Sequence, residues 1–315
     1  MIDSTQGVPG LKGALRYVRA YRDQVFVVKL GGDVLADPDV LDHVAGQIGL
    51  LHSLGIRLVV VHGGGPQATA MLHRLGAEAV MVAGRRVTDA AALEVAKMVY
   101  PGLLSTELLS ALRRHQVQAV GLSGVDADLL TAHRRPPQQV KGDDGTVREV
   151  DYGFVGDIDS VDPRILGTLL GARFVPVVAS LAGDGDGNVY NVNADTVAET
   201  LAIALKAMKL LFLTGAPGVL RDRSNPASLV AFADPDDLAE LLRNGAIGGG
   251  MRPKVEACIR AATNGVERTH IIDGRLHDSI LLEVFTGTGA GTMIVGRKEK
   301  ATYLGVDLAD GDRAS

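Results

Sequence analysis

The sequence predicts an α/β protein: a three-layer αβα sandwich with a mainly parallel central sheet, divided into two lobes. Short runs of apolar, often β-branched residues alternate along the chain with longer segments of helical periodicity, which is the pattern of a parallel sheet with helices on both faces. A length of 315 residues is enough for a full core and for two domains. Hydrophobic residues make up 46% and charged residues 22%, as in a globular rather than a disordered chain.

The first predicted elements are an amphipathic helix and a buried strand. Residues 11–22 place Leu11, Leu15 and Val18 on one helical face and several basic residues on the other. The continuous apolar run at 25–30 indicates a strand buried on both faces. The same alternation then predicts helices at 38–54, 66–75, 89–100 and 104–115, and strands at 57–62, 79–82 and 117–122.

The middle of the chain separates two α/β units. Residues 134–150 are polar and rich in turn residues, which predicts an exposed hairpin or loop. A strand at 174–179 ends near the glycine-rich stretch 183–187, where we place the boundary between the lobes. The second unit is predicted to contain helices at 194–207, 235–244 and 252–264 and strands at 209–213, 268–272 and 292–295. The expected organisation is an N-terminal helical segment at 1–22, lobes at 23–183 and 184–296, and a polar tail at 297–315.

Charge and cysteine content exclude several classes of protein. The net charge of −5 and the pI of about 5.9 give no indication of nucleic-acid binding. The single cysteine, Cys258, excludes an intrachain disulfide framework and a cysteine-based zinc site, as expected in a reducing compartment. The N-terminus lacks an apolar signal region, and no segment approaches the ~18 apolar residues of a membrane span. We therefore expect a cytoplasmic protein that binds neither membranes nor nucleic acid.

Two predicted strands end in glycine turns that suit phosphate. Lys29-Leu30-Gly31-Gly32 closes one strand, and His62-Gly63-Gly64-Gly65 closes the next. Glycine lets the backbone turn sharply and present bare N–H groups to a ligand, and lysine adds a point charge for phosphate. An isolated lysine at a strand end would simply reach solvent. Because Lys29 precedes two glycines at the carboxyl end of a strand, it indicates a ligand, and the two turns together predict a phosphoryl-transfer site.

A dinucleotide site is the alternative interpretation of the second turn. Residues 63–68 match the fingerprint G-x-G-x-x-A between a strand and a helix, whereas the Gly-Lys dipeptide of a Walker-A loop occurs nowhere. However, the strand at 79–82 ends without the acidic residue that would hold a ribose, and the fingerprint leaves the turn at Lys29 unexplained. The glycine-rich stretch 287–291 precedes a strand rather than a helix. A dehydrogenase is therefore disfavoured.

Two further segments place polar residues at helix starts. Asn193 and Asp195 come just before a long apolar helix, where they could cap its first N–H groups or carry a function. Lys254 follows Pro253 at the start of another helix. A lysine there opposes the helix macrodipole, which indicates a role outside the helix, whereas the plain alternative is a flexible loop ahead of a helix.

With these segments in order, the chain resembles the amino-acid-kinase superfamily and, within it, the acetylglutamate kinases. The resemblance runs from about residue 10 to residue 296, and its most specific parts surround Arg86, residues 191–195 and Lys254. The matching stretches are VVKLGGDVL (27–35), VVVHGGGPQ (59–67), GRRVTD (84–89), AVGLSGVDADLLTA (119–132), GFVGDIDSVDP (153–163), VYNVNADTVAETLA (189–202) and GGMRPKVEA (249–257).

The resemblance implies ATP-dependent phosphorylation of the side-chain carboxylate of N-acetyl-L-glutamate to N-acetyl-L-glutamyl 5-phosphate, a step of arginine biosynthesis. A carboxylate with a pKa near ~4.3 is already ionised at neutral pH, so no protein base is needed. The site must instead bring two anions together and stabilise charge on the phosphoryl oxygens. Mg²⁺ would accompany ATP, held mostly by water and phosphate oxygens rather than by protein ligands.

The resemblance also implies roles for individual residues. Lys29 and Lys254 would contact the transferred phosphoryl group and the nucleotide, and Asp195 would hold both lysines. Arg86 would grip the α-carboxylate of the substrate as a planar fork. The remaining site residues would be Gly32, Gly64 and Gly65 at the phosphoryl group and the reacting carboxylate, Asn191 and Asn193 at the substrate, and Thr214 and Gly218 at the nucleotide.

Two positions depart from the family pattern. Where the family commonly has Thr-Asp-Val, this chain has Thr214-Gly215-Ala216, so an aspartate near the nucleotide is missing. Ser105-Thr106 stands where an asparagine is usual. Neither position belongs to the core catalytic set, but the first bears on nucleotide affinity.

Residues 11–22, 277–286 and 289–292 resemble features found in arginine-sensitive members of the family. We expect feedback inhibition by arginine bound near His277, Glu283 and Gly289, and a hexamer built as a trimer of dimers through the N-terminal helix. The plain alternative is that this helix covers its own sheet edge and that Glu283 is a solvated helix residue.

Two other functions remain open. One is a sister kinase that acts on aminoadipate or glutamate linked to a carrier protein. The other is a non-catalytic role, as an arginine sensor or as the kinase-like part of an acetylglutamate synthase, whose acetyltransferase domain needs more residues than follow 296. The presence of Lys29, Asp195 and Lys254 favours a catalyst.

Overall fold

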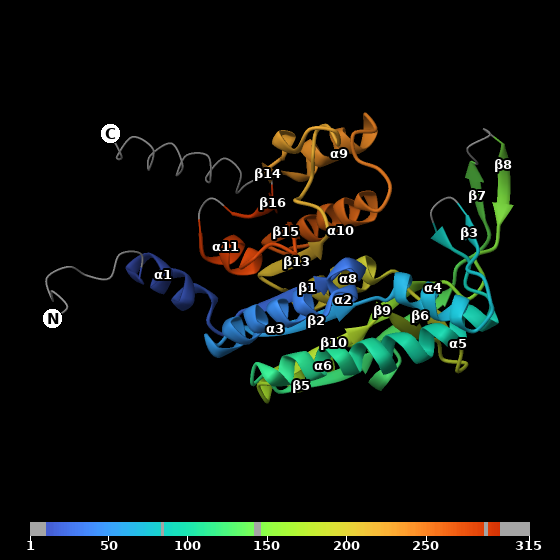
Figure 1. Cartoon of the computed structure of the whole chain (residues 1–315), viewed down its shortest axis with the longest axis horizontal. Helices are drawn as coiled ribbons and strands as arrows, with labels where there is room; N and C mark the ends of the chain where they lie inside the picture. Colours follow the sequence, from blue (N-terminus) through green and yellow to red (C-terminus); the bar gives the residue numbers. More distant parts are fainter. Residues whose placement is uncertain (1–10, 83–84, 142–145, 287–288, 297–315) are drawn as a thin grey trace, which may run out of the picture.

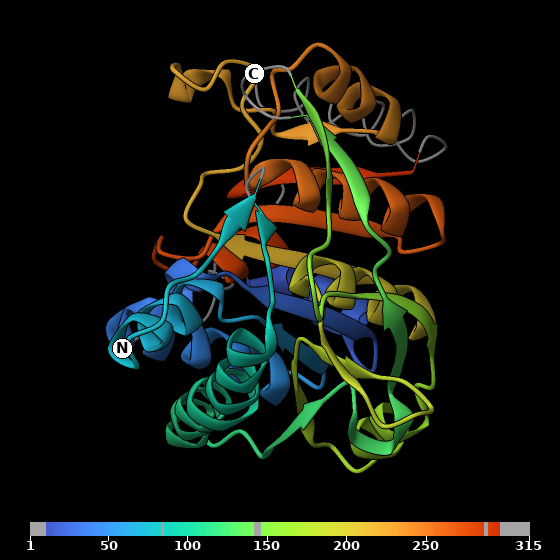
Figure 2. The same cartoon turned by 90° about the vertical axis from the view of Figure 1, so that its right-hand side faces the viewer.

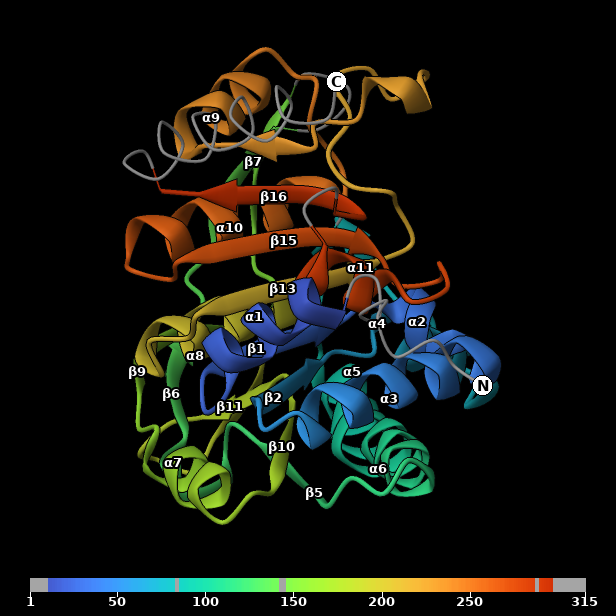
Figure 3. The same ribbon diagram turned by 90° about the vertical axis from the view of Figure 1, so that its left-hand side faces the viewer.

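The computed structural model describes residues 11–82, 85–141, 146–286 and 289–296, without the side chains of residues 11–15, 85 and 141. Its centre is an eight-stranded sheet. The strands, in chain order, are β1 (Val25–Leu30), β2 (Arg57–His62), β5 (Ala119–Ser123), β10 (Val175–Ala179), β13 (Lys209–Thr214), β14 (Phe232–Ala233), β15 (Arg268–Asp273) and β16 (Gly291–Val295). They lie side by side in the order β14-β16-β15-β13-β1-β2-β10-β5 (Figure 3), and all neighbours are parallel except β15 and β16.

Helices cover both faces of this sheet and close two hydrophobic cores. Successive residues of β1 face opposite sides, so Val28 packs in one core and Val27 in the other, which confirms the predicted three layers. The Val28 core includes α2 (Gly32–Ala36), α3 (Pro38–Ser53), α4 (Gly65–Arg74), α5 (Ala90–Met98), α6 (Ser105–Arg114) and α11 (Ser279–Phe285). The Val27 core includes α7 (Arg164–Gly171), α8 (Ala194–Ala204), α9 (Pro235–Arg243) and α10 (Met251–Thr263).

The strand predicted at 79–82 does not belong to the central sheet. Instead, β3 (Met81–Val82) pairs antiparallel with β4 (Arg85–Arg86) in a separate hairpin. The physical reason is exposure, because Val80 and Met81 face solvent and provide no buried run. The hairpin predicted within 134–150 is present as β7 (Gln138–Lys141) and β8 (Val147–Val150), and both hairpins project from the same side of the molecule (Figures 1 and 2).

A second, four-stranded sheet was not predicted. It consists of β6 (Leu130–Arg134), β9 (Gly156–Val161), β11 (Leu181–Gly183) and β12 (Val189–Asn191), in the order β12-β11-β6-β9. The two predicted helices at 89–115 are joined by a π-helical stretch, Val99–Leu104. The lobe boundary near residue 183 stays a prediction, since the central sheet takes strands from both sides of it. The predicted tail at 297–315 lies outside the described residues.

Helix α1 (Leu11–Tyr21) lies to one side of the sheet (Figure 1). Its last turn packs on α11, because the rings of Tyr17 and Tyr21 lie 6.5 and 6.2 Å from that of Phe285. The side chains of Leu11 and Leu15, to which we assigned an apolar face, lie outside the description. Among the described helices, none combines the length and the apolar character needed to cross a membrane.

Candidate active site

The two glycine turns lie together at one edge of the central sheet. β1 and β2 are parallel neighbours with Leu30 opposite His62, so both turns open at the carboxyl ends of adjacent strands. Gln67 Nε2 donates a hydrogen bond of 3.1 Å to the Gly32 carbonyl, which ties the second turn to the first. At Gly64 an added Cβ would lie 2.5 Å from a Leu104 carbon and 2.6 Å from a Tyr100 carbon, so a larger residue would displace both side chains.

Asp195 joins the two predicted lysines in a buried ion cluster. Its Oδ1 lies 2.8 Å from Lys29 Nζ, and its Oδ2 lies 3.1 Å from Lys254 Nζ. Lys29 comes from β1, Asp195 from the first turn of α8, and Lys254 from the first turn of α10. Lys29 is 7% exposed and Asp195 is 5% exposed. Three segments far apart in the sequence therefore meet in one charged contact.

The start of α8 explains why Asp195 is available to the lysines. Asn193 is the N-cap residue, and its side chain accepts a hydrogen bond of 2.8 Å from the N–H of Asp195. Of the two residues that could have capped this helix, Asn193 does so, while the Asp195 carboxylate turns to the lysines. At α10, Lys254 Nζ also donates to the Gly250 carbonyl over 3.2 Å.

The charges of this cluster depend on one another. Burial lowers the pKa of Lys29 and nearby Lys254 adds to the effect, against the attraction of Asp195. Burial alone would raise the pKa of Asp195, but the two lysines together hold that pKa below its ordinary value. Asp195 is therefore ionised at neutral pH. One carboxylate shared by two ammonium groups leaves positive charge for an anionic ligand.

A cavity of about 520 Å³ lies against the turns and the cluster. Arg86 of β4 reaches its wall and donates hydrogen bonds to the Gly65 carbonyl and the Thr69 hydroxyl. The Asn191 side chain is fixed by a hydrogen bond of 3.1 Å from Nδ2 to Thr88 Oγ1. The predicted site residues in the described lining are Lys29, Gly32, Gly64, Gly65, Arg86, Asn191 and Asn193.

Two arginines that the sequence did not single out also line the cavity. Arg135 binds Asp157 with Nε 3.1 Å from each carboxylate oxygen. Arg260 of α10 binds Glu199 of α8 at 2.7 and 2.6 Å, and burial raises the pKa of Glu199 against the pull of this arginine. Their partners lie 22 and 61 residues away in the chain, so no local pattern marks either arginine.

Thr214 and Gly218, which we assigned to the nucleotide, are not part of this lining. Thr214 ends β13, beside the end of β1, and its hydroxyl accepts a hydrogen bond of 2.9 Å from the N–H of Ala216. Gly218 has φ 145°, a conformation that favours glycine. At Gly215 an added Cβ would lie 2.6 Å from Asp33 Oδ2. A carboxylate from α2 thus lies beside the position where the family pattern has an aspartate.

The residues predicted to bind arginine are only partly brought together. Glu283 is 6% exposed, and its Oε1 lies 2.6 Å from His270 Nδ1, so the alternative of a solvated Glu283 is wrong. At Gly289 an added Cβ would lie 2.9 Å from Glu283 Oε2, which places these two residues in contact. His277 is exposed and pairs with Asp278 over 2.9 Å.

Known proteins resemble this chain over most of its length. A model of the amino acid kinase family matches residues 24–273. The acetylglutamate kinase of Myxococcus xanthus is 49% identical over 286 residues, which cover 90% of this chain and 93% of that protein. The acetylglutamate kinase of Methanothrix thermoacetophila is 44% identical over 281 residues, which cover 89% and 96%.

Solved structures give the same architecture. An N-acetylglutamate synthase from Neisseria gonorrhoeae, complexed with coenzyme A and N-acetyl-glutamate, matches with a TM-score of 0.77 at 27% identity. The match covers 93% of this chain and 64% of the synthase chain, so this chain spans less than two thirds of that protein. A carbamate kinase from Giardia matches with a TM-score of 0.62 at 16% identity, which concerns the fold alone.

Proposed function

This chain belongs to the amino acid kinase family, and from that membership we propose that it transfers the γ-phosphoryl group of ATP to the side-chain carboxylate of N-acetyl-L-glutamate. The products are N-acetyl-L-glutamyl 5-phosphate and ADP, and the reaction belongs to arginine biosynthesis. Curated acetylglutamate kinases between 39% and 49% identical to this chain support this substrate.

The observation that carries the proposal is the ion cluster of Lys29, Asp195 and Lys254 beside the cavity. The acceptor carboxylate is ionised at neutral pH, so the protein need not remove a proton, but it must hold two anions together. Two lysines from separate elements, fixed by one buried carboxylate, supply positive charge that is already in place when the phosphoryl group moves. Asp195 acts here as a positioning residue for both lysines.

The rest of the cavity would bind and orient the substrates. The N–H groups of Gly32, Gly64 and Gly65 would face the phosphoryl group and the reacting carboxylate, as bare backbone donors do for anions. Arg86 would bind the α-carboxylate. Asn191, whose side chain is hydrogen-bonded to Thr88, and Asn193, the N-cap residue of α8, would complete the substrate contacts. Thr214 and Gly218 would lie at the nucleotide, beyond the described cavity.

Mg²⁺ would enter with ATP. The only acidic residue in the described cavity lining is Glu256, which Arg252 holds at 2.8 Å, and both Asp195 oxygens face lysines. The residues present therefore fit an ion held by phosphate oxygens and water, the usual arrangement for Mg²⁺. When bound, the ion would neutralise phosphate charge. Asp33, which lies beside Gly215, would be the carboxylate available where the family commonly has an aspartate.

ATP-dependent formation of an acyl hydroxamate tests the proposed reaction. With hydroxylamine present, we expect hydroxamate from N-acetyl-L-glutamate and little from free glutamate, aminoadipate or carrier-linked forms of either. Stronger ADP release with a carrier-linked acceptor would favour the sister kinase. Binding of arginine without any phosphoryl transfer would favour a non-catalytic sensor.

Replacing Arg86 by lysine should raise the Michaelis constant for acetylglutamate much more than that for ATP. The guanidinium can hold a carboxylate with two parallel hydrogen bonds, whereas an ammonium group cannot. Steady-state kinetics with each substrate varied in turn measures both constants. Equal increases in both would count against Arg86 at the α-carboxylate.

Arginine inhibition, a hexamer and a cytoplasmic location are the finer parts of the proposal. The contact between α1 and α11 supports a link between the N-terminal helix and the predicted effector site, because Glu283 and Phe285 lie on the same short helix. A helix that precedes the first strand can extend from its own domain and pack against a neighbouring subunit.

Deleting residues 1–22 should reduce the assembly to dimers and abolish arginine inhibition while catalysis is retained. The physical reason is that the deletion removes both the proposed intersubunit contact and the aromatic contact with α11. Light scattering gives the assembly size, and assays with and without arginine give the inhibition. A truncated protein that remained hexameric and sensitive to arginine would show that the helix has neither role.

A further inference from the structure

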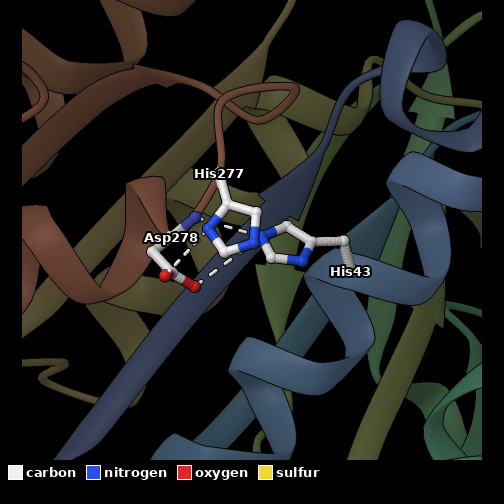
Figure 4. Close-up of side chains that lie close together, drawn as sticks. All are labelled: His43, His277 and Asp278. Atoms are coloured by element: carbon white, nitrogen blue, oxygen red, sulfur yellow. Dashed lines mark hydrogen bonds and ion pairs between the residues drawn. The ribbon is translucent and has the colours of Figure 1, made fainter.

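A group of side chains that could ligate a metal ion lies outside the active site, between α3 and the turn before α11. It consists of His43, His277 and Asp278, which we call the His43 cluster (Figure 4). His277 Nδ1 lies 2.9 Å from Asp278 Oδ2, and His43 Nε2 lies 3.7 Å from Asp278 Oδ1. One ligand atom from each residue lies within 4.8 Å of the others. We propose that the His43 cluster binds a divalent transition-metal ion of the zinc class.

The donor set suits such an ion. Zinc takes imidazole nitrogen and carboxylate oxygen at about 2.0–2.2 Å, so neighbouring ligand atoms of a tetrahedral site lie ~3.4 Å apart. The distances between ligand atoms in the His43 cluster lie on both sides of that value. Small rotations of the exposed His277 and the half-buried His43 and Asp278 side chains would bring the three ligand atoms to tetrahedral spacing. Water would fill the remaining position. Two imidazoles also distinguish this site from a Mg²⁺ site, which takes oxygen ligands.

The protein already holds the two sides of the cluster together. Gln47 lies one turn after His43 on α3, and its Oε1 accepts hydrogen bonds from the N–H groups of Ile280 at 2.9 Å and Leu281 at 3.4 Å. Gln47 is 3% exposed, so this contact fixes the start of α11 against α3. The ligands therefore do not have to be brought together from separate mobile segments.

The orientation of the His43 ring supports the same conclusion. Its Nε2 accepts a hydrogen bond of 3.0 Å from the N–H of Asp278 and so points into the cluster (Figure 4). The rings of His43 and His277 lie with their centroids 4.2 Å apart. On coordination, His43 Nε2 would bind the ion in place of the Asp278 N–H. That N–H would then donate a hydrogen bond to water.

The surroundings favour a cation. A cavity of about 360 Å³ lies beside the cluster, and the titratable residues of its lining are Asp39, Asp42, His115, His43 and Asp278. Asp42 is bound by Arg114 at 3.0 Å and His115 at 3.1 Å, whereas Asp39 has no ion pair within the described part of the chain. The chain has no competing thiolate, because burial raises the pKa of its single cysteine, Cys258, to about 12.

The test uses the full chain without an added histidine tag and with Zn²⁺ or Co²⁺ alone, in the absence of nucleotide. We expect one equivalent of Zn²⁺ by calorimetry, visible d–d absorption on Co²⁺ binding, and a higher melting temperature with saturating Zn²⁺. His43→Asn and His277→Asn should each weaken binding on the order of tenfold or more, since each removes one of three ligands. His277 is 82% exposed at its side chain, so its replacement leaves folding unaffected.

Two matched histidine variants complete the design. His73→Asn, at an exposed position of α4, should leave binding unchanged. His115→Asn alters the neighbouring cavity but none of the three proposed metal ligands, so it should retain most of the affinity for Zn²⁺. The proposal is overturned if no saturable binding is seen, if His43→Asn and His277→Asn bind as the unchanged chain does, or if only His115→Asn weakens binding.

Discussion

Replacing Lys29 by alanine should lower turnover by about two to three orders of magnitude, and Lys254→Ala should do the same, as expected for the loss of one charge-stabilising donor. Each lysine contributes one of the two ammonium groups that Asp195 holds beside the cavity. The charge on the phosphoryl oxygens would then be met by a single lysine. A coupled assay of ADP release on purified protein measures kcat for both variants.

A lysine outside the described cavity lining provides the control for this result. Lys97 is an exposed residue of α5, so Lys97→Ala should retain turnover and stability. Because Lys29 is buried, its replacement can also affect folding, and the melting temperature must be measured on the same preparation. Near-normal turnover in a folded Lys29→Ala or Lys254→Ala protein would remove that lysine from the proposed mechanism.

The parts of the site that the sequence predicted are those marked by local patterns. β1 and β2 are buried parallel strands, so their sequences are continuous apolar runs. Each strand ends in glycines, and at Gly64 neighbouring side chains leave no room for a Cβ. The start of α8 was indicated by Asn193, a residue type that caps helices. Lys254 was indicated as functional because a lysine near a helix N-terminus is unfavourable to the helix dipole. The resemblance then connected these separate segments, and the structure shows Lys29, Asp195 and Lys254 in contact.

The parts that were missed depend on contacts between distant residues. In the four-stranded sheet, β11 and β12 have only three residues each. β9 is mostly half-buried or exposed and contains mixed polar residues, so no apolar run or alternation indicates it. Arg135 and Arg260 line the cavity, and each is held there by a carboxylate distant in the sequence, Asp157 and Glu199 respectively. The same holds for position 215. The sequence shows that Gly215 stands where the family commonly has an aspartate, but only the structure shows that Asp33 lies beside it.

The other large effect is expected at Asp195, where asparagine keeps the shape of the side chain and removes its charge. Asp195→Asn should reduce turnover by about two orders of magnitude or more, since both lysines lose the group that orients and neutralises them. Burial already lowers the pKa of Lys29, and loss of the carboxylate lowers it further, so a larger fraction of Lys29 becomes neutral as the pH rises. Turnover of the variant should therefore recover partly as the pH is lowered.

A variant at another helix cap, Asp234 of α9, provides the control that distinguishes a loss of turnover from simple destabilisation. Asp234 caps α9 and accepts hydrogen bonds from the N–H groups of Asp236 and Asp237, outside the described cavity lining. Asp234→Ala should lower the free energy of unfolding by about 1 kcal/mol with turnover retained. If Asp195→Asn behaved in the same way, with a lower melting temperature, normal turnover and no recovery at lower pH, its role would be structural. Because Asn193 already caps α8 and the Asp195 carboxylate is bound by two lysines, we expect the kinetic loss instead.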